Sequence, residues 1–387
     1  MTLPERTKTK RAAHIVAGIL SYDARVKSYI AMLTKAGWSV DVICYREIDK
    51  PAMETLDKVR IFRVSDKYQG NSVLLYLNAY RRFYSRAKKL LKRLHNEDPY
   101  DMIHINNMPN FLIGMTTSLK PKPFVILDMH DIMSINYKTK FGGFPPVVKL
   151  TEMEERWSLK RADAVICADH GQKEALESLH GFKDAHVIMN LANPEVFKWS
   201  DHSYKGGKFR FVYSGTIAHR LGVDRAVKAL SNLPENIVLR IIGDGDGLDD
   251  LKKVINEKGL EERVELILRV PVEQVPELLK DCHAGVIPSR KTEATDKVMI
   301  PVKFMEYCAV GLPSVVSNLF NLRRYIDEEQ ALLFAPDSLE SMLESMLLIA
   351  TRDYEREKVT INIKLFTEKF KWEGSEREYR SIILLRA

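Results

Sequence analysis

Cysteine is scarce in this chain: only Cys44, Cys167, Cys282 and Cys308 occur among 387 residues. They lie far apart in the sequence, and none belongs to a C-x-x-C pair. This spacing is not that of a zinc knuckle or of a small fold held together by disulfides. We therefore expect four small buried residues without a metal-binding or redox role.

Long hydrophobic runs are also absent. No stretch approaches the roughly 20 apolar residues that cross a bilayer, and residues 1–11 are polar, unlike the hydrophobic region of a secretory signal. We expect a cytoplasmic protein. A chain of 387 residues that is 45% hydrophobic exceeds what one compact core usually holds, so the sequence predicts two globular domains.

The chain has a net charge of +7, although 52 acidic residues are mixed among 59 basic ones. The surplus is concentrated in residues 81–93, which carry seven lysines and arginines and no acidic residue. At 100° per residue this region predicts a helix with one apolar and one basic stripe. The apolar stripe contains Tyr76, Tyr80, Phe83, Ala87, Leu90 and Leu94, and the basic stripe contains Arg82, Arg86, Lys89 and Arg93.

Two interpretations of this basic helix stay open. In the first, the apolar stripe packs in the core and the basic stripe is a solvated outer face. In the second, the segment Arg81–Arg93 docks on an anionic membrane surface, which would make the protein peripheral at the inner face of a membrane. We expect no nucleic-acid partner, because the helix lacks the interleaved aromatic residues of a base-stacking platform.

Short apolar runs alternate with helical patterns twice along the chain, which is typical of βαβ units and a mostly parallel sheet. Strands are predicted over residues 12–18, 40–45, 60–64, 102–105, 125–128 and 164–168, and then over 209–214, 238–242, 264–268, 284–288 and 314–317. Between the two halves, residues 190–207 are rich in turn-forming residues and predict a linker. Two such domains would leave a cleft lined by the carboxyl ends of both sheets, where ligands are expected.

A cation and a carboxylate share one face of a short helix in the second half. Lys303 and Glu306 stand one turn apart near its start, and the helix is predicted to end at Gly311. A helix N-terminus carries partial positive charge and unpaired N–H groups, so Lys303 adds to a ready phosphate site and Glu306 can accept hydrogen bonds from sugar hydroxyls. These features favour a nucleotide with a diphosphate. The alternative is an ordinary strand-loop-helix unit with a surface ion pair.

Motifs along nearly the whole chain resemble those of one enzyme family. They are Asp23–Val26, Tyr100–His104, Leu127–Asp131 and Asp163–Ile166 in the first half, and Tyr213–Thr216, Ile242–Gly245, Pro301–Tyr307 and Lys371–Glu373 in the second. In this order and spacing they resemble the glycosyltransferases of family four, which are retaining enzymes that use nucleotide sugars. The resemblance implies an α/β protein of the GT-B class, with two Rossmann-like domains facing each other across a cleft.

The resemblance also assigns the two domains. Residues 1–195 would form the acceptor-binding domain and residues 205–365 the nucleotide-sugar-binding domain. The C-terminal helix, residues 372–387, is expected to pack back on the first domain through Tyr379, Ile382 and Ile383.

In the second domain, the resemblance implies a site for the donor diphosphate. Gly215 and Thr216 close a strand, and a glycine there lets backbone N–H groups approach the diphosphate closely. Arg220 resembles the family's basic phosphate ligand, which together with Lys303 would neutralise the leaving group. The alternative for Arg220 is an exposed arginine in a first helical turn.

Gly243 and Asp244 resemble the family's loop near the nucleotide, and the alternative is a plain acidic turn. Asp244 and Asp246 form a D-x-D pattern similar to a metal site. GT-B enzymes, however, generally hold the diphosphate with cations and amides, so the resemblance predicts no metal and no cofactor besides the donor substrate.

Glu306 matches the second of two glutamates that have seven residues between them, and in relatives this residue bonds the ribose hydroxyls of the donor. The first glutamate would fall at position 298, which is Val298 here, so backbone amides around Val302 are expected to bind the donor sugar instead. Thr216 stands where many relatives have arginine. Arg220 and Lys303 are then left to carry most of the phosphate charge.

In the first domain, His130 and Asp131 follow a strand and are expected to face the cleft. His130 resembles the family histidine beside the donor sugar, a task that suits a neutral imidazole. Asn106 and Asn107 follow another strand and are candidates for contacts with sugar hydroxyls. Further upstream, Asp23 and Arg25 begin a predicted helix.

Asp23 is a candidate helix cap, and Arg25 is a candidate contact for an anionic acceptor. For Arg25, a simple role at the capped helix start is an equally good interpretation.

The activity implied is transfer of a hexose, with retention of configuration, to a glycan or lipid-linked acceptor in cell-surface polysaccharide or glycoconjugate synthesis. His130, Asp131, Arg220, Lys303 and Glu306 would form the catalytic site. Catalysis would be mainly electrostatic, because no carboxylate is placed as a nucleophile. The leaving phosphate itself would take the acceptor proton.

Two alternatives to this activity stay open. One is another GT-B enzyme, such as a nucleotide-sugar epimerase or a hydrolase. The other is a non-catalytic sugar-nucleotide-binding subunit that supports an active partner, which the missing first glutamate at Val298 permits.

Overall fold

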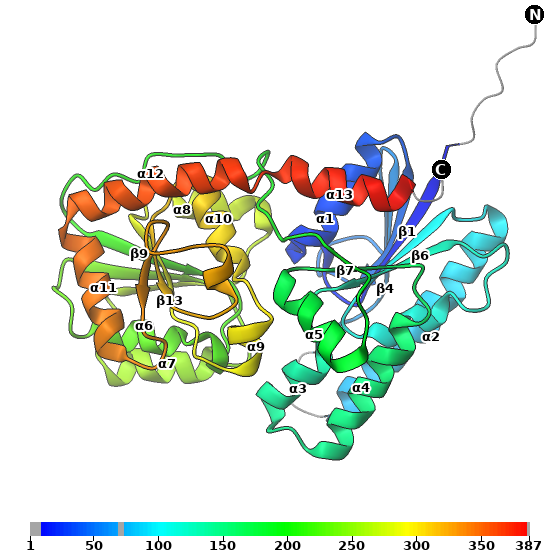
Figure 1. Cartoon of the computed structure of the whole chain (residues 1–387), viewed down its shortest axis with the longest axis horizontal. Helices are drawn as coiled ribbons and strands as arrows, with labels where there is room; N and C mark the ends of the chain where they lie inside the picture. The colour runs from blue at the N-terminus through cyan, green and yellow to red at the C-terminus, as the bar shows by residue number, and fades with distance from the viewer. Residues whose placement is uncertain (1–8, 69–72, 385–387) are drawn as a thin grey trace, which may run out of the picture. The chain divides into compact units, whose positions relative to one another are not determined.

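The computed structural model describes residues 9–68 and 73–384, and the chain forms two compact units (Figure 1). Unit 1 contains the chain up to Ile188 together with the residues from Glu376 on, and unit 2 is Met189–Ser375. Residues 189–195, which the sequence analysis assigned to the first domain, therefore group with unit 2. Likewise, only the part of the C-terminal helix from Glu376 on groups with unit 1.

Unit 1 is built on an eight-stranded sheet with the order β3-β4-β2-β1-β5-β6-β7-β8. Its strands are β1 (Arg11–Val16), β2 (Ser39–Tyr45), β3 (Met53–Leu56), β4 (Val59–Ser65), β5 (Met102–Asn106), β6 (Phe124–Met129), β7 (Ala164–Cys167) and β8 (Ala185–Val187). Neighbouring strands are parallel except for β3, which is antiparallel to β4. The central strands are buried along their whole length, because helices cover both faces of the sheet.

Helices follow most strands of unit 1. They are α1 (Ala24–Lys35), α2 (Val73–Glu97), α3 (Met133–Phe141), α4 (Pro145–Leu159), α5 (His170–His180) and the short turns η1 (Leu20–Tyr22) and η2 (Asn110–Met115). In Figure 1, α1 lies beside α13 (Trp372–Leu384), whereas α2 and α4 lie on the opposite side of the unit.

The basic helix α2 packs its apolar stripe into the core of unit 1. Phe83, Ala87 and Leu94 are buried, while Leu91 rather than Leu90 completes the stripe. Tyr76, which the predicted stripe included, is exposed. The six side chains that line the outer face are exposed cations: Arg81, Arg82, Arg86, Lys89, Lys92 and Arg93.

Helix α13 completes the core of unit 1. Tyr379, Ile382 and Ile383 are buried. The ring of Tyr379 lies 4.4 Å from the ring of Tyr29 on α1, measured between centroids. The last turns of the chain therefore cover residues from its beginning.

Unit 2 contains a six-stranded parallel sheet with the order β11-β10-β9-β12-β13-β14. Its strands are β9 (Phe209–Ser214), β10 (Ile237–Ile242), β11 (Val264–Ile267), β12 (Ala284–Ile287), β13 (Ser314–Ser317) and β14 (Leu332–Phe334). Its helices are α6 (Val223–Leu230), α7 (Leu248–Glu257), α8 (Val275–Leu279), α9 (Glu293–Lys297), α10 (Val302–Val310), α11 (Leu339–Thr351) and α12 (Asp353–Lys369), with the turns η3 (His219–Leu221), η4 (Val272–Gln274) and η5 (Leu322–Arg324). Two apolar clusters of buried residues form its core.

Three strands and three helices of the described structure were not predicted from the sequence, namely β3, β8, β14, α3, α5 and α9. Strand β3 is mostly exposed at the edge of the sheet, and β8 and β14 are three residues long, so none of them carries a clear apolar pattern. Helix α5 had readable signals, since Asp169 caps its start by accepting from the Gln172 N–H at 2.9 Å and Gly181 ends it with positive φ. Over residues 9–68 and 73–384, no helix combines the length and apolar character that a bilayer span requires.

All four cysteines are buried and free of disulfide bonds, as predicted.

Candidate functional site

Two glycines bring the carboxyl ends of β9 and β10 close together. Gly215 follows β9 with φ of 128°, and Gly243 follows β10 with φ of 153°. A Cβ atom at Gly243 would overlap the carbonyl oxygen of Gly215, so only glycine allows this approach. The Gly215 N–H is used inside the fold, because it donates to the Ile242 carbonyl oxygen at 2.8 Å. The N–H left at this strand end is that of Thr216, for which the described residues offer no backbone acceptor.

The Lys303 side chain packs against this glycine turn. It occupies the first turn of α10, and its Nζ atom would be 3.4 Å from a Cβ atom at Gly215. The same atom lies 4.7 Å from the centre of the Tyr213 ring. Burial, assisted by the nearby charge of Arg220, lowers the pKa of Lys303 to about 8, and Glu306 only partly opposes this shift.

Glu306 is half-buried one turn further along α10. Burial raises its pKa to about 7, although the charge of Lys303 acts in the opposite direction. Lys303 and Glu306 do not form a salt bridge with each other, so the surface ion pair considered above is not what the structure contains. Both side chains keep polar atoms for a ligand. The Lys303 ammonium group could bind a diphosphate, and the Glu306 carboxyl group, one turn further along α10, could bind a ribose.

Arg220 adds a second positive charge to this strand end. It lies in the turn η3 and is half-buried. Burial is the main cause of the lowered pKa of Lys303, and the charge of Arg220 contributes to it. Within the described part of the chain its guanidinium has no carboxylate partner, whereas the neighbouring Arg290 is paired with Asp224 at 2.7 Å.

We refer to Gly215, Arg220, Gly243, Lys303 and Glu306 together as the Lys303 site. It combines two cations, a tight glycine turn and the N-terminus of α10. This combination suits a phosphate-containing ligand.

A residue that the sequence analysis did not single out lies beside this site. Arg269 donates to the Thr216 hydroxyl at 3.3 Å and lies 3.1 Å from the Asp244 carboxylate. It follows the end of β11, and a basic residue directly after a predicted strand was the signal that could have identified it. Asp244 thus forms an ion pair with Arg269.

No cluster of three or more potential metal ligands occurs among residues 9–68 and 73–384. The absence of a bound metal during catalysis stays a prediction. Val298, at the position of the missing glutamate, is buried at the end of α9, and Val302 is exposed at the first position of α10.

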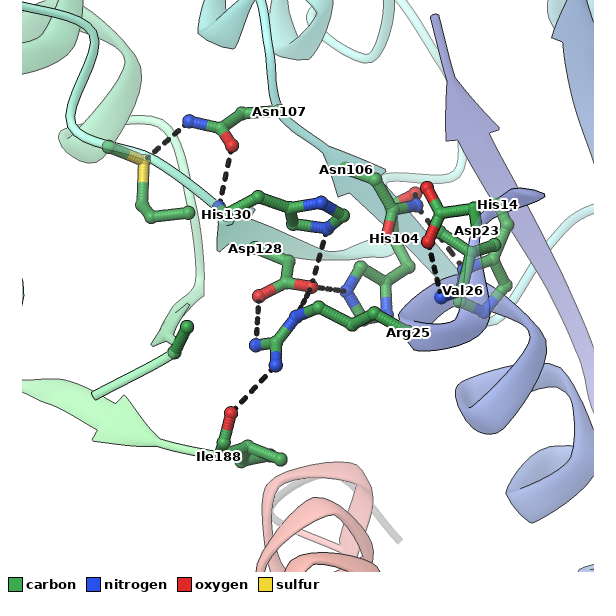
Figure 2. A network of polar contacts seen from close by, with 12 residues as sticks. His14, Asp23, Arg25, Val26, His104, Asn106, Asn107, Asp128, His130 and Ile188 are labelled. Atoms are coloured by element: carbon green, nitrogen blue, oxygen red, sulfur yellow. Dashed lines mark hydrogen bonds and ion pairs between the residues drawn. The ribbon is translucent and has the colours of Figure 1, made fainter. Parts of the chain in front are cut away.

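In unit 1, basic side chains surround the buried carboxylate of Asp128 near the end of β6 (Figure 2). Arg25 donates to Asp128 from Nε at 2.7 Å and from NH2 at 2.6 Å. The His130 Nε2 atom lies 3.0 Å from the same carboxylate, and His104 Nε2 lies 3.8 Å away. We refer to Arg25, His104, Asp128 and His130 as the Asp128 cluster.

The members of this cluster shift one another's pKa values. Burial would raise the pKa of Asp128, but Arg25 and the histidines hold it well below its usual range. Burial would lower the pKa of His130, yet the Asp128 carboxylate raises it overall. Burial dominates at His104 and lowers its pKa. The pKa values of His130 and His104 are thus shifted in opposite directions, because the Asp128 carboxylate lies closer to His130.

The two candidate asparagines serve the fold. Asn106 is fully buried and donates to the Ile15 carbonyl oxygen at 3.3 Å. Asn107 accepts from the backbone N–H of His130 at 2.6 Å and donates to the Asp131 carbonyl oxygen at 2.8 Å. Both amide atoms of Asn107 are occupied inside unit 1, whereas Asn106 is fully buried and its Oδ1 has no hydrogen-bond partner among the described residues. Contact of these amides with sugar hydroxyls stays a prediction.

Asp23 and Arg25, at the start of α1, also bond within unit 1. Asp23 caps the helix, as predicted, by accepting from the Val26 N–H at 3.0 Å. Arg25 points inward to Asp128 instead of toward an acceptor. Asp131 is half-buried directly after His130.

Comparisons with known proteins agree with this geometry. Residues 198–365 match the family described as "Glycosyl transferases group 1", and residues 24–196 match "Glycosyltransferase Family 4". An uncharacterized glycosyltransferase of Methanocaldococcus jannaschii is 24% identical over 311 residues, which is 79% of this chain and 79% of that protein.

Solved structures show the same fold. Sucrose-phosphate synthase from Thermosynechococcus elongatus has a TM-score of 0.77 at 17% identity, covering 97% of this chain and 100% of that one. An Anabaena protein solved in complex with UDP and glucose has a TM-score of 0.72 at 14% identity, covering 97% and 99%. The α/β, GT-B class predicted from the sequence is confirmed, with one Rossmann-like domain in each unit.

Proposed function

The chain belongs to the glycosyltransferases of family 4, and on this premise we propose that it transfers a hexose from a nucleoside-diphosphate sugar with retention of anomeric configuration. The acceptor is a glycan or a lipid-linked saccharide in the synthesis of cell-surface polysaccharide or another glycoconjugate. UDP is the first nucleotide to test, because a structural neighbour was solved with UDP and glucose.

One observation carries the proposal: the Lys303 ammonium group lies at the Gly215 turn and Arg220 lies in the following turn η3, and neither cation has a carboxylate salt bridge in the described residues. Two uncompensated charges suit the two phosphates of a nucleoside diphosphate. They would also stabilise the negative charge that builds on the diphosphate as the sugar leaves.

The remaining contacts of the donor follow from the same site. Glu306 would accept hydrogen bonds from the ribose hydroxyls. With Val298 buried and apolar, the donor sugar would be held by backbone amides around Val302. Gly215, Thr216, Gly243 and Asp244 would line the turn next to the diphosphate.

His130, followed by Asp131, would contact an oxygen of the donor sugar. With Nε2 facing the Asp128 carboxylate, a neutral His130 ring can accept a hydrogen bond from a sugar hydroxyl at Nδ1. No metal is required, because cations of the protein balance the diphosphate.

The test is calorimetric binding of UDP, together with release of UDP from UDP-sugars. We expect Lys303→Ala to weaken UDP by about 10- to 100-fold, which is the effect of one charge-assisted hydrogen bond to phosphate, and to leave uridine binding nearly unchanged. Lys252→Ala, an exposed lysine on α7, is the matched control. Equal losses for UDP and uridine would reject the phosphate role of Lys303.

A second candidate is a sugar-nucleotide-binding subunit without its own turnover, which Val298 favours because the first glutamate of the family is missing. This candidate predicts tight UDP-sugar binding and no UDP release with any acceptor. Measurable release that depends on Lys303 rejects it.

An anionic membrane surface is the partner we propose for α2. Its apolar stripe is buried, so the helix cannot insert that face into lipid. Its outer face offers six exposed cations between Arg81 and Arg93, and Leu75, Tyr76 and Leu77 are exposed at its N-terminal end. This arrangement suits electrostatic contact with lipid headgroups, with these three side chains adding a small apolar contribution.

A further inference from the structure

Nitrogen atoms of neighbouring side chains lie close to both carboxylate oxygens of Asp128. Oδ1 accepts from Arg25 NH2 at 2.6 Å, and Oδ2 accepts from Arg25 Nε at 2.7 Å. His130 Nε2 and His104 Nε2 approach Oδ2 to 3.0 and 3.8 Å. The carboxylate is completely buried and carries a negative charge, so each nitrogen that faces it must carry a hydrogen.

This requirement sets the tautomer of His130. The contact between Nε2 and Oδ2 has the length of a hydrogen bond although its angle is bent, and a lone pair on Nε2 would be repelled by the carboxylate. Nε2 is buried, while the side chain as a whole keeps 20% of its surface exposed. Nδ1, on the other edge of the ring, is the nitrogen left for a ligand.

The tautomer of His104 is set by Tyr379 on α13. Its Nδ1 lies 3.0 Å from the hydroxyl oxygen of Tyr379 on α13. Burial raises the pKa of Tyr379 well above its usual range, so its hydroxyl stays protonated and can donate to Nδ1. The His104 proton is then on Nε2, where it faces Asp128.

The backbone of His130 is held separately. Its N–H donates to Asn107 Oδ1 at 2.6 Å, and its carbonyl oxygen accepts from Gln172 at 2.9 Å. The main chain and the ring are thus restrained by different residues. This is the arrangement that a side chain needs if one ring atom must be presented in a single orientation.

We propose that Asp128 and Arg25 are positioning residues for His130, which keep its ring proton on Nε2 and leave Nδ1 as the atom that meets an oxygen of the sugar donor. Tyr379, through His104, supports the same orientation from α13. The inference rests on the proposed function, in which His130 contacts the donor.

The direct test is the ring nitrogen spectrum of His130 by 15N NMR, with its signals assigned by their loss in His130→Gln. In the neutral form of the wild-type imidazole we expect a protonated Nε2 and an unprotonated Nδ1. In Asp128→Asn the amide can present its NH2 group to the ring, so the proton should move to Nδ1. We expect kcat to fall by about 10- to 100-fold, while KM for the donor changes less than about 3-fold. A wild-type ring with its proton on Nδ1 would overturn the proposal, as would an unchanged spectrum and kcat in the variant.

Asp128→Asn leaves Arg25 buried without its ion-pair partner and can prevent folding. A second pair of variants avoids that problem. Tyr379→Phe removes one hydroxyl from His104, and Tyr29→Phe removes a neighbouring buried hydroxyl that has no hydrogen-bond partner. The rings of both tyrosines lie against His104, at 5.7 and 4.8 Å between centroids.

We expect Tyr379→Phe to shift the ring signals of His104 and His130 and to lower kcat about 3-fold, with Tyr29→Phe close to the wild type. Equal effects of the two variants on both readouts would show generic packing and overturn the role of Tyr379. The spectra need no substrate. Correct tautomers in a protein that releases no UDP would therefore count against the proposed function, whereas wrong tautomers in an active enzyme would count against this proposal.

Discussion

The Lys303 ammonium nitrogen lies 4.7 Å from the centre of the Tyr213 ring, at the point where β9 ends. An aromatic face stabilises a positive charge without neutralising it. A carboxylate in a salt bridge would neutralise it. Lys303 therefore keeps its charge for a ligand. The same burial that brings it to the ring lowers its pKa to about 8.

UDP binding should consequently weaken as the pH rises through this value. Below about pH 8 Lys303 is protonated and attracts the diphosphate, and above it the neutral amine does not. Calorimetry between pH 7.5 and 9.5 should show a loss of about 10-fold in the wild type. Lys303→Arg, which stays charged, should bind with little change over the same range. A flat profile for the wild type would contradict this prediction.

Replacement of Gly243 should damage the fold next to the diphosphate. A Cβ atom there would overlap the Gly215 carbonyl oxygen, and the φ of 153° is strained for any other residue. We expect Gly243→Ala to lower the free energy of unfolding by at least about 2 kcal/mol in urea denaturation. Gly374→Ala is the control, because nothing lies within 4 Å of its added methyl group and it lies in α13. That variant should be neutral or more stable by up to about 1 kcal/mol.

Arg269 should matter for UDP affinity through Asp244. Arg269→Ala would leave the Asp244 carboxylate uncompensated near the bound diphosphate, since the two side chains are 3.1 Å apart. We expect Kd for UDP to rise about 5- to 10-fold, and the double variant Arg269→Ala with Asp244→Asn to recover most of the loss. Strictly additive effects in isothermal titration would show that the two residues act separately.

Charge reversal on α2 tests whether this helix binds an anionic membrane surface. Arg82, Arg86 and Arg93 are all exposed, so changing them to Glu should leave the fold intact. Because each cation near an anionic surface contributes about 1 kcal/mol, the variant should no longer sediment with vesicles that contain phosphatidylglycerol. The matched control changes Lys252, Lys258 and Lys358, exposed lysines of unit 2, to Glu. Loss of vesicle binding in both variants would point to overall charge rather than to α2.

Divalent cations should be dispensable for donor binding. The described residues contain no cluster of metal ligands, and Asp244 is paired with Arg269. Treatment with EDTA should therefore leave the Kd for UDP within about 2-fold of its value with magnesium. A large loss of affinity that magnesium restores would show that the protein's cations are insufficient.

The sequence predicted most strands and the start of α10 because these features depend on local patterns. Runs of apolar residues mark buried parallel strands, and Gly311 ends α10 with positive φ as its position predicted. The placement of Lys303 on the first turn follows from the same local signals.

Contacts between distant parts of the chain were not predictable in this way. Arg25 and Asp128 are 103 positions apart, and His104 and Tyr379 are 275 apart. Each residue alone has several plausible roles, and only the fold selects one. For this reason the sequence predicts Arg25 and Asn107 as candidate ligand contacts, although both side chains bond within unit 1.

The contact of Tyr379 with Tyr29 and His104 has a consequence for how the protein is made. A ribosome completes residues up to Ile188 long before it reaches α13, so the ring of Tyr29 and the imidazole of His104 in the nascent first unit lack the cover that Tyr379 provides. A fragment that stops at Ile188 should for this reason be unstable on its own. Unit 1 can therefore finish folding only when α13 has emerged from the ribosome.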